Sequence, residues 1–94
     1  MSLLENIRNI TYYYIKKKYK IFLKEKKIKY IKKKQIINFS NDIFDNKSDK
    51  IKVYIKENLK KIMKNDMPKE EDLNELISDM MEDRDLVINR LVLE

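Results

Sequence analysis

The chain has 94 residues, of which 43% are hydrophobic and 40% are charged, a balance that fits one small folded domain rather than a disordered tail or a membrane protein. It contains no His, Cys or Gly, which excludes a histidine base, a thiolate nucleophile, a zinc site with imidazole or sulfur ligands, and a glycine-rich phosphate loop. The net charge of +6 combines twelve basic and two acidic residues over positions 1–37 with ten basic and fourteen acidic residues over positions 38–94.

The first segment repeats apolar side chains at the helix period. Residues 3–22 place one stripe within about 140° of arc, at the 100° per residue of an α-helix, and the stripe consists of Leu3, Leu4, Ile7, Ile10, Tyr14, Ile15, Ile21 and Phe22. Ile28 and Ile36 extend this stripe, although lysines interrupt it. The spacing therefore predicts a long basic first helix that exceeds thirty residues.

A second interpretation of the same region is a β-hairpin through residues 18–31. Tyr19, Ile21 and Leu23, and then Ile28 and Tyr30, alternate with polar neighbours at the period of a strand. The missing Gly, Asn or Asp in residues 24–27 argues against a tight hairpin turn. We therefore expect the helix and keep an α+β fold with this hairpin as the alternative.

Residues 38–48 hold the densest cluster of Asn, Asp and Ser, which favour turns and caps, and this cluster predicts a linker between the basic and acidic halves. Ser48 is a candidate cap for a second helix that runs to about Lys64. Pro68 and the acidic residues 70–72 mark the start of a third helix, which places apolar residues at helical spacing as far as Val92.

Together these segments predict an all-α fold of three helices in a single domain over residues 1–94. The third helix has no stop signal before Glu94, a pattern typical of a helix that continues, so the chain is also interpreted as a fragment of a longer one.

A wide apolar stripe on a long first helix is more surface than two short helices can cover. This excess predicts a partner-binding surface made of Leu3, Ile7, Ile10, Tyr14 and Ile21. The leading functional hypothesis is therefore a non-enzymatic module for protein–protein interaction and assembly, which forms a homo-oligomer or binds another protein chain.

The alternative function is nucleic-acid binding by the lysine- and tyrosine-rich front segment. Lysines that neutralise phosphates and aromatic rings that stack on bases are the usual combination in such proteins. The candidate phosphate contacts are Lys16, Lys17, Lys18, Lys32, Lys33 and Lys34, and the candidate stacking residues are Tyr12, Tyr19 and Tyr30. Three observations weigh against it: lysine clusters commonly form a solvated face, the chain has only three arginines, and its abundant Lys, Ile and Asn are typical of an AT-rich genome.

Two further interpretations follow from charge and composition. A basic amphipathic helix also fits an anionic membrane surface, which is a less favoured partner here. Without the residues of the common catalytic and cofactor sites, we expect no enzyme activity, no cofactor, no metal and no small-molecule substrate. The absence of cysteine fits a reducing compartment, so the expected location is cytoplasmic.

Overall fold

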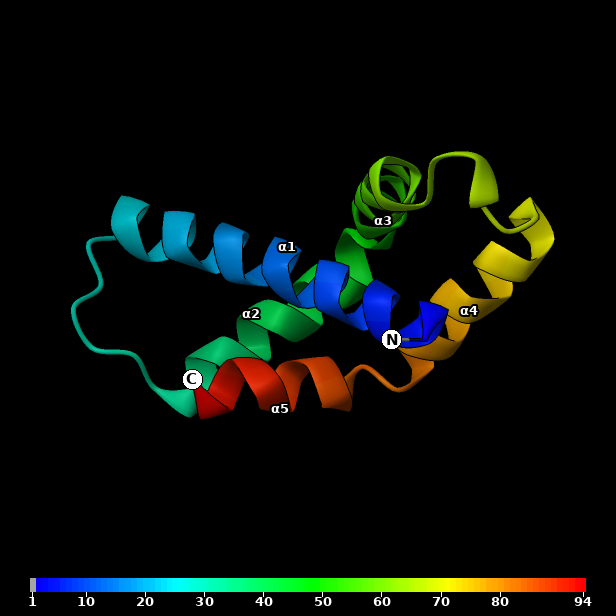
Figure 1. Ribbon diagram of the computed structural model, residues 1–94. Helices are drawn as coiled ribbons and strands as arrows, with labels where there is room; N and C mark the ends of the chain where they lie inside the picture. The colour runs from blue at the N-terminus through cyan, green and yellow to red at the C-terminus, as the bar shows by residue number, and fades with distance from the viewer. Residues whose placement is uncertain (1) are drawn as a thin grey trace.

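The computed structural model describes residues 2–94, and all regular structure within this range is helical (Figure 1). A 3-10 turn at Lys64–Asp66 separates the third and fourth of five α-helices, which are α1 (Leu3–Glu25), α2 (Lys33–Asn46), α3 (Ser48–Met63), α4 (Glu70–Glu82) and α5 (Asp85–Leu93). The all-α class is confirmed, but the prediction of three helices is wrong. The alternative hairpin over residues 18–31 is also wrong, because residues 18–25 belong to α1 and residues 2–94 contain no strand.

Helix α1 ends much earlier than the apolar spacing predicted. After Glu25 the backbone turns left-handed at Lys27, where φ is 54°. The N–H of Ile28 donates to the carbonyl of Leu23 at 3.0 Å, and the N–H of Lys27 donates to the carbonyl of Lys24 at 3.3 Å. These two bonds form a Schellman motif, which closes the helix and satisfies its last carbonyl groups. The predicted helix of more than thirty residues is therefore divided into α1, an irregular segment and α2.

Helix α2 occupies most of the segment that was predicted to be a linker. Residues 38–46 belong to α2 and residue 48 begins the next helix, so the prediction of a linker over residues 38–48 is wrong for all but Lys47. Ile36, Phe39 and Ile43 recur at helical spacing and face the core, while most of the intervening Asn and Asp side chains face solvent. The buried apolar face thus outweighed the local turn preference of the polar residues.

Helix α3 follows the predicted boundaries closely, since it runs from Ser48 to Met63. Ser48 is the first helical residue rather than the cap. The N-cap position is occupied by Lys47, and the side chain of Lys47 makes no capping hydrogen bond. A single residue, Lys47, therefore joins α2 to α3, and the chain changes direction sharply there.

The predicted third helix is divided in two at Asp83 and Arg84. The guanidinium of Arg84 lies 5.4 Å from the centre of the Phe44 ring and donates to the Asp45 carboxylate at 2.8 Å. These contacts hold the break between α4 and α5 against α2. The division changes the direction of the chain between α4 and α5, so that α5 runs alongside α1 in the same direction (Figure 1).

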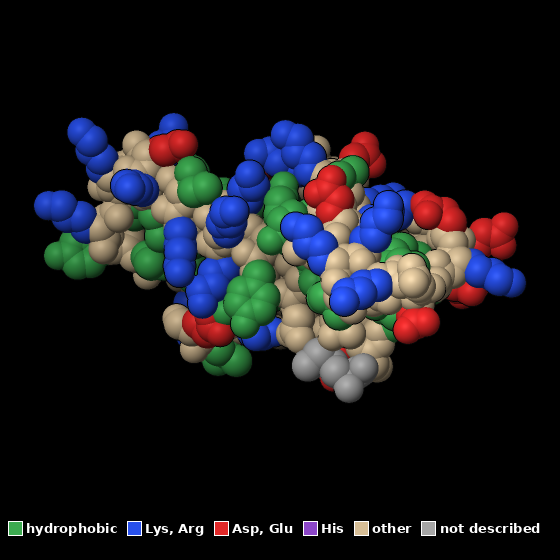
Figure 2. All heavy atoms as spheres, turned by 45° about the horizontal axis from the view of Figure 1, so that its top comes forward, with side chains coloured by type: hydrophobic (Ala, Val, Ile, Leu, Met, Phe, Trp, Pro, Cys, Tyr) green, Lys and Arg blue, Asp and Glu red, His purple; other side chains and the backbone are tan. Residues whose placement is uncertain are grey.

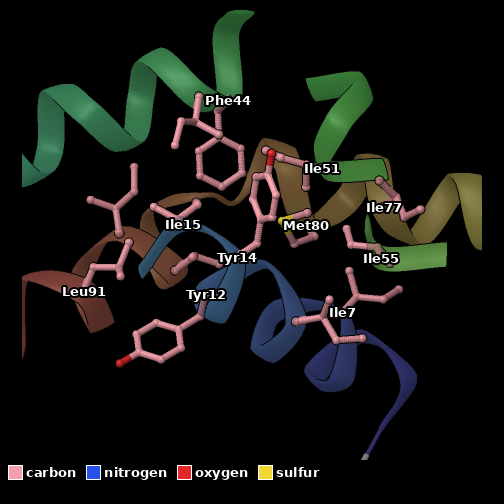
Figure 3. Packing of buried hydrophobic residues seen from close by; sticks show 14 of the residues in the cluster. Ile7, Tyr12, Tyr14, Ile15, Phe44, Ile51, Ile55, Ile77, Met80 and Leu91 are labelled. Atoms are coloured by element: carbon pink, nitrogen blue, oxygen red, sulfur yellow. The ribbon is translucent and has the colours of Figure 1, made fainter. Parts of the chain in front are cut away.

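The core surrounds the first half of α1, which is packed by α3, α4 and α5 (Figure 3). Large apolar side chains with no exposed surface come from α1, α3 and α4, and they are Ile7, Ile15, Ile51, Ile55, Leu59, Ile77 and Met80. Burial of so many large apolar side chains is the main favourable term in the stability of a small domain. The second half of α1 projects beyond this core at one end of a molecule 43 Å long.

Candidate nucleic-acid interface

The projecting end of the molecule is strongly basic. We call residues 16–34 the basic segment; it contains eleven lysines and one acidic residue, Glu25. It comprises the second half of α1, the irregular residues that follow and the start of α2, and ten of its eleven lysines are exposed. Figure 2 shows Lys and Arg side chains gathered over α1, with more of the carboxylates toward the opposite end of the molecule. Such a distribution creates a positive potential that attracts polyanions.

The three consecutive lysines in α1 point to different sides of the helix. Lys16 faces α5, where its Nζ lies 3.1 Å from a carboxylate oxygen of Glu94 and 5.5 Å from the centre of the Tyr12 ring. Lys18 lies on another side, with its Nζ 5.6 Å from the centre of the Tyr14 ring. Lys17 is exposed and makes neither kind of contact within residues 2–94. Because successive helical residues are 100° apart, the cluster spreads its charge around α1 rather than forming one patch.

The second predicted lysine cluster lies where α2 begins. Lys32 precedes the helix, and its backbone N–H donates to the side-chain oxygen of Gln35 at 3.2 Å. Lys33 and Lys34 are in the first turn of α2 and are exposed. The fold brings Lys33 to the same groove as Lys16 and Lys20, although these residues are more than ten positions apart in the sequence. The two predicted clusters therefore meet in part.

The three predicted stacking residues have very different surroundings. Tyr12 is only 1% exposed, because the guanidinium of Arg90 lies 3.9 Å from its ring centre and its hydroxyl donates to Glu94. Tyr19 is 8% exposed and packs against Phe22 and Phe39. Only Tyr30, which is 84% exposed, has a ring that a base could reach. Two of the three rings are thus used in packing.

The predicted partner-binding stripe is also largely used within the chain. Ile7, Ile10 and Tyr14 belong to the core and Leu3 is partly buried against it. Ile21 is the member that remains on the surface, with 43% of its area exposed. Most of the stripe is covered because α3, α4 and α5 pack around the first half of α1.

A shallow groove between α1 and α3 brings together residues that the sequence interpretation did not combine. This α1–α3 groove has a volume of about 470 Å³ and is lined by Tyr13, Lys16, Lys17, Lys20, Ile21 and Tyr54. Tyr13 is 55% exposed, so its ring is accessible beside three lysines. The helix spacing contained a signal for this arrangement, because Tyr13, Lys17 and Lys20 are separated by four and then three residues and share a face.

Tyr54 forms the α3 side of this groove and packs against Tyr14 of α1. Their ring centres lie 4.8 Å apart, and the backbone carbonyl of Tyr54 accepts a hydrogen bond from the side chain of Asn58 at 2.8 Å. Burial, and secondarily the nearby Tyr54, raise the pKa of the Tyr14 hydroxyl above its ordinary value of 10.0. The charge of the groove is provided by its lysines, which are Lys16, Lys17 and Lys20.

Comparisons with other proteins add no functional assignment. No family model matches the chain, and no curated protein or solved structure is found to be similar to it. Among the helices of residues 2–94, none is both long enough and apolar enough to span a membrane.

Proposed function

We propose that this chain is a non-enzymatic protein that binds single-stranded nucleic acid on the face formed by α1 and α3. The observation that carries the proposal is the α1–α3 groove, where the accessible ring of Tyr13 lies beside Lys16, Lys17 and Lys20. The groove belongs to a basic segment whose eleven lysines are accompanied by one acidic residue. A ring beside several ammonium groups matches the two chemical features of a single strand, which are unstacked bases and phosphates.

The lysines would provide most of the affinity. Each phosphate neutralised by an ammonium group releases condensed counterions, and this release favours binding strongly at low salt. Lys17 and Lys20 are exposed and belong to none of the four ion pairs within residues 2–94, so they have no carboxylate to exchange for a phosphate. Binding through these side chains therefore has little competition from inside the protein.

The tyrosines would favour a single strand over a duplex. A base can stack on Tyr13 only after it has left the stack of a double helix, and stacking contributes roughly 1–3 kcal/mol per base. Every base has a flat face, so we expect binding that tolerates many sequences. The shortage of arginine supports the same expectation, because arginine is the residue that most often recognises guanine edges in a duplex.

The test is fluorescence anisotropy of a labelled single-stranded oligonucleotide of mixed sequence, titrated with protein at several salt concentrations. We expect the logarithm of the binding constant to fall with the logarithm of salt concentration, with a slope of magnitude about 3 or more, as for four or more phosphate contacts. Lys17→Glu should reduce this slope by about 0.7 or more, and Tyr13→Ala should weaken binding about tenfold with the slope unchanged.

A matched control for the charge change is Lys61→Glu, which reverses an exposed lysine of α3 that does not line the groove. Equal losses of oligonucleotide affinity in Lys17→Glu and Lys61→Glu would show that only net charge matters. That result would contradict the assignment of the binding site to the α1–α3 groove. Tyr30→Ala provides the comparison for Tyr13→Ala. If Tyr30→Ala alone weakens binding, the stacking residue lies in the irregular segment instead.

Self-association remains the second candidate, favoured by the opposite charges at the two ends of the molecule. Helix α4 contains six acidic residues and no lysine or arginine, and it lies far from the basic segment (Figure 1). Complementary ends can attract a second copy in a head-to-tail arrangement, which also steers association at low salt. Light scattering in the buffers of the titration decides between the candidates, because a mass above one chain without oligonucleotide binding would support only self-association.

A further inference from the structure

A second groove lies on the side of α1 that faces α2 and α5. It has a volume of about 520 Å³, within the range of roughly 300–1,000 Å³ that is common for small-molecule sites. Leu23 of α1, Ile36 of α2, and Leu91 and Val92 of α5 form much of its lining. We call it the α1–α2–α5 groove. Its apolar walls would receive a hydrocarbon chain, because burial of methylene groups is favourable by about 0.8 kcal/mol each.

Two lysines give this groove a positive charge that is not neutralised within the chain. Lys20 and Lys33 both line it, and neither belongs to the four ion pairs formed within residues 2–94. The carboxylate of Glu94 also lines the groove, but it is occupied by the Nζ of Lys16 at 3.1 Å and by the Tyr12 hydroxyl. Lys20 and Lys33 therefore both remain available to face an anionic group in the groove.

The hydroxyl of Tyr19 supplies the third feature of the groove. Tyr19 lines the groove and is 8% exposed, and its oxygen is buried without a hydrogen-bond partner among residues 2–94. A buried polar group without a partner is unfavourable by about 1–3 kcal/mol, and most such groups in folded proteins are satisfied. An acceptor atom of a ligand in the groove would remove this penalty.

From these three features we infer that the α1–α2–α5 groove binds a long-chain carboxylate of the fatty-acid type. Its chain lies against Leu23, Ile36 and Val92, and its carboxylate accepts a hydrogen bond from Tyr19 and faces Lys20 and Lys33. A single carboxylate fits because its two oxygens can accept the hydrogen bond from Tyr19 and face both ammonium groups. This ligand goes beyond the proposed binding of nucleic acid and does not depend on it.

The experiment uses isothermal titration calorimetry with laurate, kept below its critical micelle concentration, and the full chain. We expect saturable binding of laurate that is at least fivefold tighter than that of dodecyltrimethylammonium, which has the same chain and a positive head group. Tyr19→Phe preserves the packing against Phe22 and Phe39 and should weaken laurate binding roughly tenfold, because it removes a hydrogen bond to a charged group.

The same variant separates a role in binding from a role in folding. Because Tyr19→Phe removes a buried group without a partner, the free protein should melt at an equal or higher temperature while laurate binding is lost. Lys33→Glu should weaken laurate binding more than fivefold, whereas its neighbour Lys34→Glu, which does not line the groove, should leave it within twofold.

Three results would overturn the inference: no saturable heat with laurate, equal binding of the cationic amphiphile, or unchanged laurate affinity in Tyr19→Phe. None of these results bears on the oligonucleotide titration, since the Tyr19 hydroxyl is buried away from the α1–α3 groove. Lys33→Glu and Lys34→Glu should lower oligonucleotide affinity to a similar degree. The failure of one proposal is therefore distinguishable from the failure of the other.

Discussion

The two halves of α1 have the same helical backbone but opposite surroundings. In the first half, residues 3–15, six side chains are buried and α3, α4 and α5 pack around the helix. In the second half, residues 16–25, only Tyr19 is buried and five lysines line the surface. The comparison shows that one amphipathic helix can form the centre of a core at one end and an exposed, lysine-rich surface at the other.

The largest expected effect tests whether the halves differ in stability as they do in burial. Ile15→Ala, at a fully buried position of the first half, should lower the free energy of unfolding by about 2–5 kcal/mol through lost apolar burial and the resulting cavity. Ile21→Ala, at an exposed position of the second half, should change it by only about 0.5 kcal/mol. Urea denaturation followed by circular dichroism measures both, and similar losses would contradict the division.

A smaller effect concerns the end of the second half. Lys27 has a positive φ of 54°, which is unfavourable for a residue with a Cβ atom by about 1–2 kcal/mol. We expect Lys27→Gly to raise the free energy of unfolding by about 1 kcal/mol, because glycine adopts this conformation freely. The matched control is Lys26→Gly, where φ is −87° and no gain should follow. A gain in both variants would attribute the effect to lost charge repulsion rather than to the backbone.

The smallest expected effect is a loss of stability at alkaline pH. It involves Tyr14 in the first half of α1 and Tyr19 in the second. Burial raises the pKa of Tyr14, assisted by nearby Tyr54, and burial alone raises that of Tyr19. Above about pH 10 the unfolded chain loses these protons while the folded chain keeps them, so the free energy of unfolding falls as pH rises. Tyr14→Phe and Tyr19→Phe should each reduce this fall, as measured by urea titrations at pH 9 and pH 11. A steeper fall in either variant would contradict the assigned cause.

The sequence predicted the elements whose apolar pattern and boundary signals agree. Helix α3 was located almost to its ends, and the acidic first turn of α4 was identified because Glu70, Glu71 and Asp72 favour the positive end of the helix dipole. The all-α class followed from the same periodicity. The number of helices did not follow from the sequence. The end of α1, the extent of α2 and the division between α4 and α5 lack the residues that usually mark a helix boundary.

Each missed boundary has a physical reason. The Schellman turn after α1 has lysine where glycine is usual, so no sequence signal marked it. The Asn and Asp residues of α2 favour turns locally, but the buried face that contains Ile43 and Phe44 keeps them helical. The division at Arg84 depends on its contacts with Phe44 and Asp45, which are about forty positions away and cannot be inferred from local spacing.

The spacing predicted which residue types reach the surface of α1 better than it predicted which tyrosine is exposed. The sequence selected Tyr12 as a candidate stacking residue, whereas the exposed ring beside the lysines of the α1–α3 groove belongs to the adjacent Tyr13. Neighbouring positions on a helix differ by 100°, so a shift of one residue exchanges an accessible ring for one covered by Arg90. The side of α1 that faces solvent depends on where α5 packs. The sequence predicted α4 and α5 as one longer helix, so the position of α5 could not be inferred.

The pairing of α1 with α5 has a consequence for the order in which the protein can fold during synthesis. Sixty residues separate Glu25 from Asp85, so at about 5–20 residues per second a ribosome needs roughly 3–12 s to add the helix that covers Tyr12 and Asn9. During this interval α3 and α4 become available to pack against the first half of α1, but the ring of Tyr12 still lacks Arg90, which covers it in the folded protein. The surface around Tyr12 is therefore the last part of α1 to reach its final packing.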